Sequence, residues 1–208
     1  MKTSTVELGL FTRAAALQPA GEGDRIASVT FASETPVLTS RRELLGGRKF
    51  WEVLSMRDGH ARLNRLNAGA PLLDNHDRYS GVRSILGGVI EGSASIVAGF
   101  GHAKVQFSQR ASDVWQDVVD RVLRNLSAGY LVYRYQEEPA GADGIPVLRA
   151  IDWEAFELSM VPIGADVTAQ TRAAAPLNQC VLSGLTDFTV ADADRARRFR
   201  LAIARSNN

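Results

Sequence analysis

The chain has 208 residues, of which 45% are hydrophobic and 23% are charged, so it can bury a sizeable core and is not a disordered protein. Its 24 basic and 23 acidic side chains leave a formal net charge of +1, which gives no electrostatic reason to expect nucleic acid or an anionic membrane as the main partner. No apolar run is long enough to span a bilayer, and residues 1–10 do not have the pattern of a signal peptide. The single cysteine, Cys180, excludes an internal disulfide framework and suits a reducing cytoplasm.

Most of the first half of the chain predicts β-strands. Residues 25–32 alternate with the period of two of a half-buried strand, which would turn Ala27, Val29 and Phe31 toward the core. The pair Glu91-Gly92 has the composition of a hairpin turn. Further strands are predicted over residues 5–14, 50–56, 81–90 and 95–107, and loops over residues 18–23 and 39–48.

The strongest helix signal lies in residues 111–126. Four apolar side chains recur there every four residues and would form one buried stripe, namely Val114, Val118, Val122 and Leu126. Ser112 is the predicted N-cap of this helix.

The remainder of the chain predicts a further strand over residues 127–136, a loop over 137–144 and an extended segment over 145–161. After Pro162 the periodicity weakens, residues 165–179 become rich in alanine, and residues 190–205 have the composition of a basic helix. The sequence therefore predicts a strand-dominated α+β domain over 1–165, followed by a linker and C-terminal tail over 166–208.

Three histidines are present, and their surroundings differ. His60 and His102 have the settings of surface or structural histidines. His76 follows an apolar run and is flanked by Asp74 and Asp77, whose carboxylates could orient an imidazole. From the residues alone, a structural turn is the first interpretation of this segment, a catalytic base the second, and a metal site the third. The metal site ranks last because no second His or Cys cluster completes it.

Ser127 stands at the predicted helix-to-strand junction, directly before Ala128 and Gly129. A serine there can simply satisfy backbone groups, or its small neighbours can leave the hydroxyl open to a substrate. A serine becomes a nucleophile only when a base takes its proton, and His76 is the best base in the sequence. Ser159 is the rival nucleophile, ranked second because larger side chains flank it and no glycine follows. Cys180 is interpreted as an incidental thiol.

A third group would have to hold the imidazole of His76. Glu157 is the first candidate because it alternates with Ser159 along one face of a strand and needs a partner among apolar neighbours. A salt bridge with an arginine explains Glu157 equally well. Asp74, Asp77 and Asp152 are the other candidates.

Three segments form an ordered set: PLLDNHDRYSGVRSILGGV (residues 71–89), LSAGYLVYRY (126–135) and AFELSMVPIGAD (155–166). Together they resemble the prohead maturation serine proteases of tailed phages, whose signature is a histidine, then Ser-x-Gly-Tyr, then Glu-x-Ser-x-Val-Pro. The resemblance implies that His76 is the general base, Ser127 the nucleophile and Glu157 the acidic third member. Residues 163–165 read Ile-Gly-Ala where many members have Pro-Ala, so the backbone of the oxyanion hole is left unassigned.

The same resemblance implies a bent β-barrel with peripheral helices, similar to the herpesvirus assemblin proteases. It implies a serine endopeptidase that cleaves scaffold protein, major capsid protein or both, and commonly itself, inside the assembling procapsid in the host cytoplasm. Self-association is expected, whereas a cofactor, a metal, nucleic acid and a membrane are not. The alternative is a structural or scaffolding component of the procapsid that kept the protease fold and lost its activity.

Overall fold

The structure is a computed structural model that describes residues 3–19, 24–162 and 178–183. Within these ranges the chain forms one extended system of thirteen strands with few helices. The strands are β1 (Thr3–Leu8), β2 (Phe11–Pro19), β3 (Ile26–Ser33), β4 (Val37–Ser40), β5 (Lys49–Leu54), β6 (Ala61–Arg62), β7 (Pro71–Asp74), β8 (Ile85–Val89), β9 (Ser95–Val97), β10 (Phe100–Phe107), β11 (Asn125–Glu138), β12 (Val147–Met160) and β13 (Asn178–Ser183). The helices are α1 (Asn64–Asn67) and α2 (Ser112–Val119), with 3₁₀ turns at Leu45–Gly47, Gly81–Ser84 and Gln109–Ala111.

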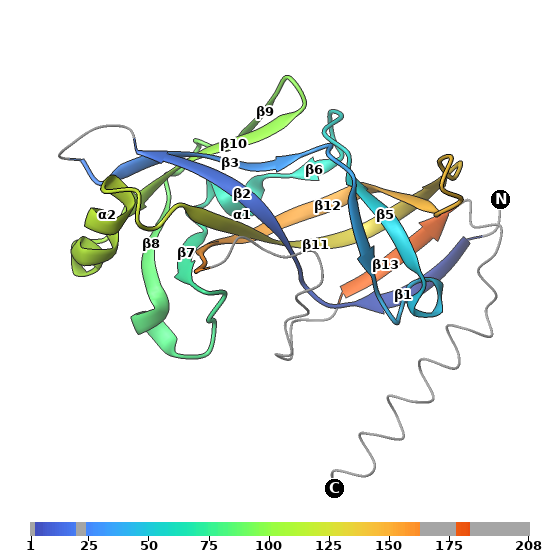
Figure 1. The fold of residues 1–208 in the computed structure, drawn as a ribbon, viewed down its shortest axis with the longest axis horizontal. Helices are drawn as coiled ribbons and strands as arrows, with labels where there is room; N and C mark the ends of the chain where they lie inside the picture. Colours follow the sequence, from blue (N-terminus) through green and yellow to red (C-terminus); the bar gives the residue numbers. More distant parts are fainter. Residues whose placement is uncertain (1–2, 20–23, 163–177, 184–208) are drawn as a thin grey trace, which may run out of the picture.

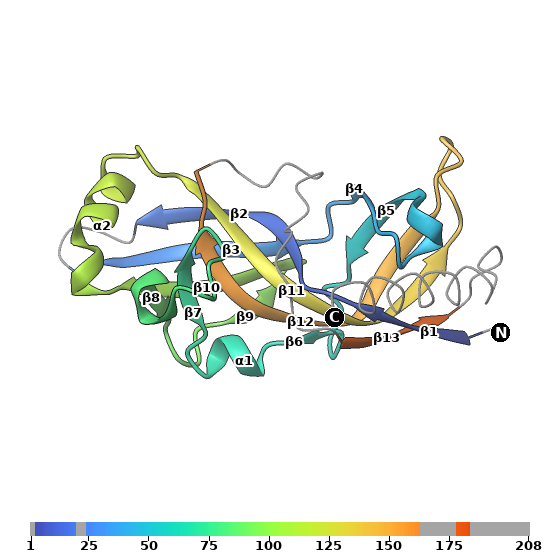
Figure 2. The same ribbon diagram turned by 90° about the horizontal axis from the view of Figure 1, so that it is seen from below.

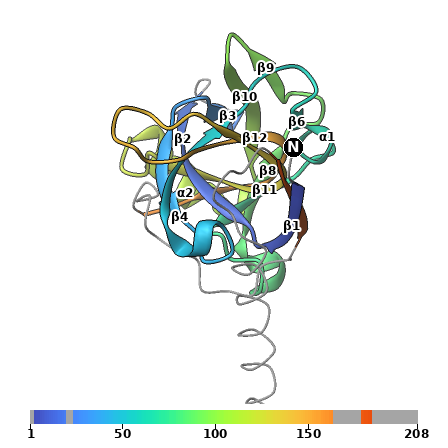
Figure 3. The same cartoon turned by 90° about the vertical axis from the view of Figure 1, so that its right-hand side faces the viewer.

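Seven of the strands close into a barrel in the order β11-β2-β3-β10-β8-β7-β12, because β12 pairs back to β11. Figure 3 shows these strands arranged around a common centre. Closure leaves no free edge within the ring, which is one of the ways in which an all-strand core protects its backbone groups. The prediction of a strand-dominated fold is confirmed.

The two longest strands, β11 and β12, extend well beyond the barrel. They pair antiparallel from Leu126 opposite Met160 to Glu138 opposite Val147, and cross most of the molecule (Figure 1). Away from the barrel, β13 and β1 continue the sheet beside β11, while β5 and β4 continue it beside β12 (Figure 2). The barrel and its extension therefore share one continuous sheet.

The alternation in β3 packs the core as predicted. Ala27, Val29 and Phe31 are all buried, and the neighbouring strands add Phe107 and Val105 to the same cluster. The predicted turn at Glu91-Gly92 is also present, with Gly92 at a φ of 69°. Such a positive φ is cheap for glycine and strained for most other residues.

The predicted helix over residues 111–126 is wrong in its second half. Helix α2 ends at Val119, and Arg121 adopts a left-handed φ of 60° that the helix cannot continue through. Val122 is consequently 69% exposed, whereas Leu126 is fully buried, but in β11. Ser112 is the first helical residue and not the N-cap, since its hydroxyl donates to the carbonyl of Gln109 (2.6 Å). Apolar residues at helical spacing thus continue across the junction of two different elements.

The prediction of a linker and tail over residues 166–208 missed strand β13. This strand lies between β1 and β11, antiparallel to the first and parallel to the second. Its inward side chains, Cys180 and Leu182, are buried in the core, which explains why an apolar pair occurs in a polar stretch. The remainder of the predicted tail, including the basic helix, lies outside the described residues. Among the described helices, none has the length and apolar character needed to cross a membrane.

Candidate functional site

A β-bulge in β12 presents Glu157. Gly129 of β11 lies opposite Glu157, yet the next residue, Tyr130, lies opposite Ala155, so Phe156 is the extra residue on β12. Bulges of this kind redirect side chains, often beside functional sites. Phe156 accordingly does not join the core face of the strand and packs beneath the guanidinium of Arg65, 4.5 Å from the ring centroid. Glu157 is left on the face of β12 opposite to the core cluster.

His76 reaches this face from the turn after β7. Parallel pairing of β7 with β12 places Leu73 opposite Ser159 and Asp74 opposite Met160. Asn75 and His76 then both adopt left-handed backbone conformations, with φ of 46° and 59°. Two consecutive left-handed residues other than glycine are uncommon and persist only where the surroundings hold them. The predicted turn at His76 is present, and it carries backbone strain.

The imidazole of His76 is hydrogen-bonded to Glu157, with 2.6 Å between Nδ1 and Oε1. The carboxylate is 0% exposed and the imidazole 10% exposed, so water cannot compensate the carboxylate if the bond breaks and can reach little of the imidazole. A carboxylate can only accept a hydrogen bond, so Nδ1 of His76 carries the ring proton. Nε2 is then the nitrogen that is free to accept a proton. This is the tautomer that a general base for a serine hydroxyl requires.

Gly129 makes room for that bond. A Cβ on Gly129 would overlap Oε1 of Glu157 and would also press on Leu10. The carboxylate therefore passes directly over the backbone of β11 on its way to His76. The glycine of the Ser-x-Gly segment is required by this close approach, independently of any role toward a substrate.

Ser127 lies on the same face of the sheet, opposite Ser159 in the β11–β12 ladder. Directly opposed residues in an antiparallel pair point to the same side, which brings Ser127, Ser159 and Glu157 together. Ser127 is fully buried, and its hydroxyl donates to the carbonyl of Arg13 on β2 (3.2 Å). Within the described residues no hydrogen bond joins Ser127 to His76.

The other predicted acids have different partners. Asp77 accepts from the backbone N–H groups of Tyr79 (2.9 Å) and Ser80 (3.0 Å), and hydrogen bonds from Ser80 and these amides lower its pKa. Asp152 forms an ion pair with Arg62 (2.6 Å), and Asp74 is exposed at the end of β7. Glu157 is thus the carboxylate that holds His76. In the ranges that the structure covers, no group of three or more His, Cys, Asp or Glu residues is placed to hold a metal.

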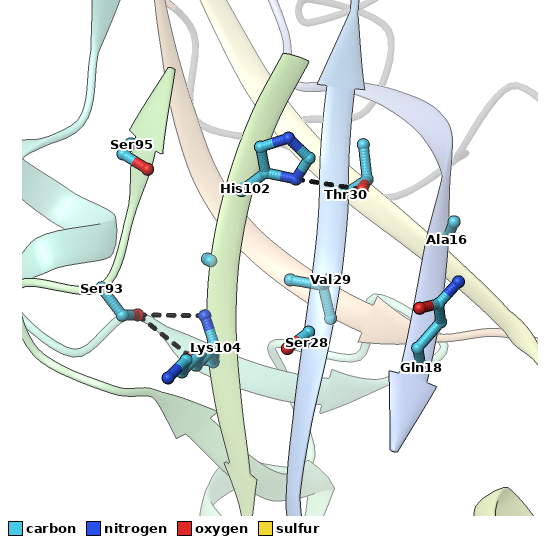
Figure 4. A pocket seen from close by; sticks show the side chains of 10 residues that line it. Ala16, Gln18, Ser28, Val29, Thr30, Ser93, Ser95, His102 and Lys104 are labelled. Atoms are coloured by element: carbon cyan, nitrogen blue, oxygen red, sulfur yellow. Dashed lines mark hydrogen bonds between the residues drawn. The ribbon is translucent and has the colours of Figure 1, made fainter. Parts of the chain in front are cut away.

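The remaining histidines lie elsewhere and pair with hydroxyls. His60 Nδ1 is 2.8 Å from the hydroxyl of Ser55, and His102 Nδ1 is 3.2 Å from that of Thr30. His102 and Lys104 line a separate open pocket over β2, β3 and β10, and none of the described residues that line it is acidic (Figure 4). Neither arrangement provides the buried carboxylate that His76 has.

Comparison with known proteins gives one informative similarity. Over 119 residues the chain is 37% identical to the major capsid protein of Halomonas phage phiHAP-1. The chain is similar to part of a phage structural protein. The aligned segment is 56% of this chain but 19% of the relative, so the chain spans about a fifth of that protein's length. No protein-family model matches the sequence, and no solved structure matches it. The predicted likeness to prohead and assemblin proteases therefore stays a prediction.

One buried polar cluster near the site was missed from the sequence. Arg13 and Glu52 are 6% and 2% exposed and lie 3.5 Å apart, and the hydroxyls of Tyr130 and Tyr135 both donate to the Glu52 carboxylate. Burial raises the pKa of each tyrosine well above its usual range. Arg13 also supplies the carbonyl that binds Ser127, so Arg13 connects this cluster to the candidate nucleophile. A glutamate between Trp51 and Val53 in a strand segment was the available signal.

Proposed function

We propose that this protein is a serine endopeptidase that acts on capsid or scaffold protein during procapsid assembly. Ser127 would be the nucleophile, His76 the general base and Glu157 the residue that orients His76. The observation that carries the proposal is the buried 2.6 Å bond from His76 Nδ1 to Glu157, on the sheet face that also presents Ser127. A carboxylate from β12, a serine from β11 and an imidazole from the turn after β7 are the parts of an acyl-transfer site.

In the proposed reaction, the hydroxyl of Ser127 attacks a peptide carbonyl while Nε2 of His76 takes its proton. This requires the hydroxyl to leave the carbonyl of Arg13, to which it donates in the structure. The Oγ–C bond forms, the peptide C–N bond breaks, and His76 returns the proton to the leaving amine. Water then repeats the sequence on the acyl-enzyme. Glu157 fixes the tautomer and stabilises the imidazolium that forms in each step.

The similarity to a phage major capsid protein supports the proposed setting. The substrates would be the capsid and scaffold proteins, and the chain itself where it is attached to them. The protein would act in the host cytoplasm, inside the assembling procapsid, and would self-associate there. No nucleic acid, membrane, metal or cofactor takes part in the proposed chemistry.

The second candidate function is a non-catalytic component of the procapsid. The name of the relative, a major capsid protein, fits this candidate better than it fits a protease. In this case the His76–Glu157 bond would only stabilise the barrel, and the protein would act through assembly with other capsid subunits. The two candidates differ in whether Ser127 reacts.

Labelling with a fluorophosphonate distinguishes them. The probe phosphonylates a serine whose base is in place, with loss of fluoride and transfer of the serine proton to the histidine. The protease proposal predicts one added phosphonyl group on the folded protein, mapped by mass spectrometry to Ser127, and none on Ser127→Ala or His76→Ala. A folded wild-type protein that takes up no label under conditions where it is fully assembled would favour the structural candidate.

A further inference from the structure

We propose that Ser159 is a positioning residue that holds Glu157 and His76 together, and not a second nucleophile. The effect of Ser159 on catalysis rests on the proposed function, but the effect of Ser159 on the His76–Glu157 bond does not. The Ser159 hydroxyl contacts both Glu157 and His76, and it helps to hold His76 in its strained left-handed conformation.

The hydroxyl of Ser159 makes two hydrogen bonds, both within the site. It donates to Oε2 of Glu157 at 2.5 Å and accepts from the backbone N–H of His76 at 3.2 Å. A serine hydroxyl has a single proton, and here that proton is directed at a carboxylate and away from His76. Attack by Ser159 would need the imidazole to take this proton. Such an attack would break the hydrogen bond that holds Glu157, whereas the bond that Ser127 must give up, to the Arg13 carbonyl, holds neither Glu157 nor His76.

The donation to Glu157 determines which carboxylate oxygen faces His76. Ser159 holds Oε2, so Oε1 is left for Nδ1 of His76 at 2.6 Å. A carboxylate that is 0% exposed has no water to accept from in place of a missing hydroxyl. Loss of the Ser159 hydroxyl would free Glu157 to rotate, and the imidazole would lose its fixed orientation.

The second bond supports the strained turn. His76 has a φ of 59°, and Asn75 before it has a φ of 46°. The backbone N–H of Asn75 donates to the carbonyl of Met160 (2.8 Å), so β12 pins both residues of the turn. A left-handed residue other than glycine is strained and needs such contacts to persist. Ser159 provides the contact at the residue that carries the imidazole.

The direct test compares Ser159→Ala with Ser55→Ala. Ser55 is a matched control because it is equally buried and also bonds to a histidine, His60, away from the candidate site. The proposal predicts that Ser159→Ala slows fluorophosphonate labelling of Ser127 by about tenfold or more, since misorientation of a base reduces rate steeply. Ser55→Ala should label at the wild-type rate, and Ser159→Thr, which keeps the hydroxyl, should recover most of the rate. If Ser159→Ala labels as fast as wild type, or if label appears on Ser159, the proposal is overturned.

A second readout needs no activity. A histidine N–H bonded to a buried carboxylate gives a proton resonance far downfield of the backbone amides, and here it belongs to Nδ1–H of His76. In Ser159→Ala this resonance should shift or disappear, while it stays in Ser55→Ala and Ser127→Ala and returns in Ser159→Thr. An unchanged resonance in Ser159→Ala would refute the positioning role even if the protein proves inactive. Conversely, a lost resonance with no labelling of the wild type would refute the proposed protease and leave the role of Ser159 intact.

Discussion

Nδ1 of His76 and Oε1 of Glu157 lie 2.6 Å apart, although 81 residues separate them in the chain. The parallel pairing of β7 with β12 brings them together, because the turn after β7 then lies beside the last residues of β12. The bulge at Phe156 places Glu157 on the same face of β12 as Ser159, and Gly129 leaves space for its carboxylate. The pair is thus built by one residue of the sheet, Glu157, and one residue of the turn that β12 holds in place, His76.

Replacing Glu157 by glutamine tests what the charge of this pair contributes. The amide has nearly the same shape, but it carries no charge to stabilise an imidazolium and can favour the wrong tautomer of His76. We expect labelling of Ser127 by a fluorophosphonate to fall by about 10²–10⁴-fold, the range in which a triad acid or a general base usually acts. Circular dichroism should show an unchanged fold. A Glu157→Gln protein that labels at the wild-type rate would mean that Glu157 has no catalytic role.

Replacing Gly129 by alanine tests the close approach of Glu157 to β11. The added methyl group overlaps Oε1 of Glu157, so the carboxylate must move away from His76. We expect the free energy of unfolding to fall by about 1–3 kcal/mol, as is typical of overpacking. The downfield Nδ1–H resonance of His76 should be lost as well.

Gly88→Ala is the matched control for this substitution. Gly88 is also a strand glycine, in β8, but the nearest atom to an added Cβ is the Ala70 carbonyl oxygen at an ordinary 3.6 Å. We expect Gly88→Ala to keep the resonance of His76. Equal effects of the two substitutions would show that Gly129 matters only as a strand glycine and not through Glu157.

The sequence predicted those features that depend on local periodicity. The alternation around Val29 located a core strand, and the serine and glutamate of the motifs lie on the paired strands β11 and β12, with the histidine in the turn after β7. The helix was overextended because Leu126 continues the apolar spacing of Val118 after the chain has turned at Arg121. Strand register and bulges depend on partners far along the chain, so neither the displacement of Phe156 nor the insertion of β13 could be read from spacing.

The buried cluster around Glu52 should contribute to stability. Tyr135 is 1% exposed, and its hydroxyl donates to Glu52. Tyr133, on the same strand, donates to the more exposed Glu154 (2.7 Å). Removing a hydrogen bond to a buried charged group costs about 1.5–3 kcal/mol. We expect Tyr135→Phe to lower the free energy of unfolding in urea by this amount. Tyr133→Phe, as the control, should have a clearly smaller effect, and the reverse order would contradict the burial of the Glu52 cluster.

The environment of Cys180 predicts a neutral thiol across the ordinary pH range. Burial raises its pKa to about 12, so the reactive thiolate is scarcely populated in the native state. We expect iodoacetamide to leave native Cys180 unmodified between about pH 7 and 9, where a free thiol begins to ionise. In denaturant the thiol should react at the rate of a model peptide. Rapid modification of the native protein would show that β13 is not packed in the core as described.

We propose that Ser127 cuts a phage capsid-assembly protein, and the decisive experiment follows the processing of that protein. The wild-type chain or its Ser127→Ala variant is co-expressed with the major capsid and scaffold proteins of its phage, and every product is weighed by intact-mass spectrometry. We expect trimmed products with the wild type and full-length proteins with Ser127→Ala, while both chains enter the same assemblies. Identical trimming with the two chains, or assembled particles with no trimming by the wild type, would contradict it.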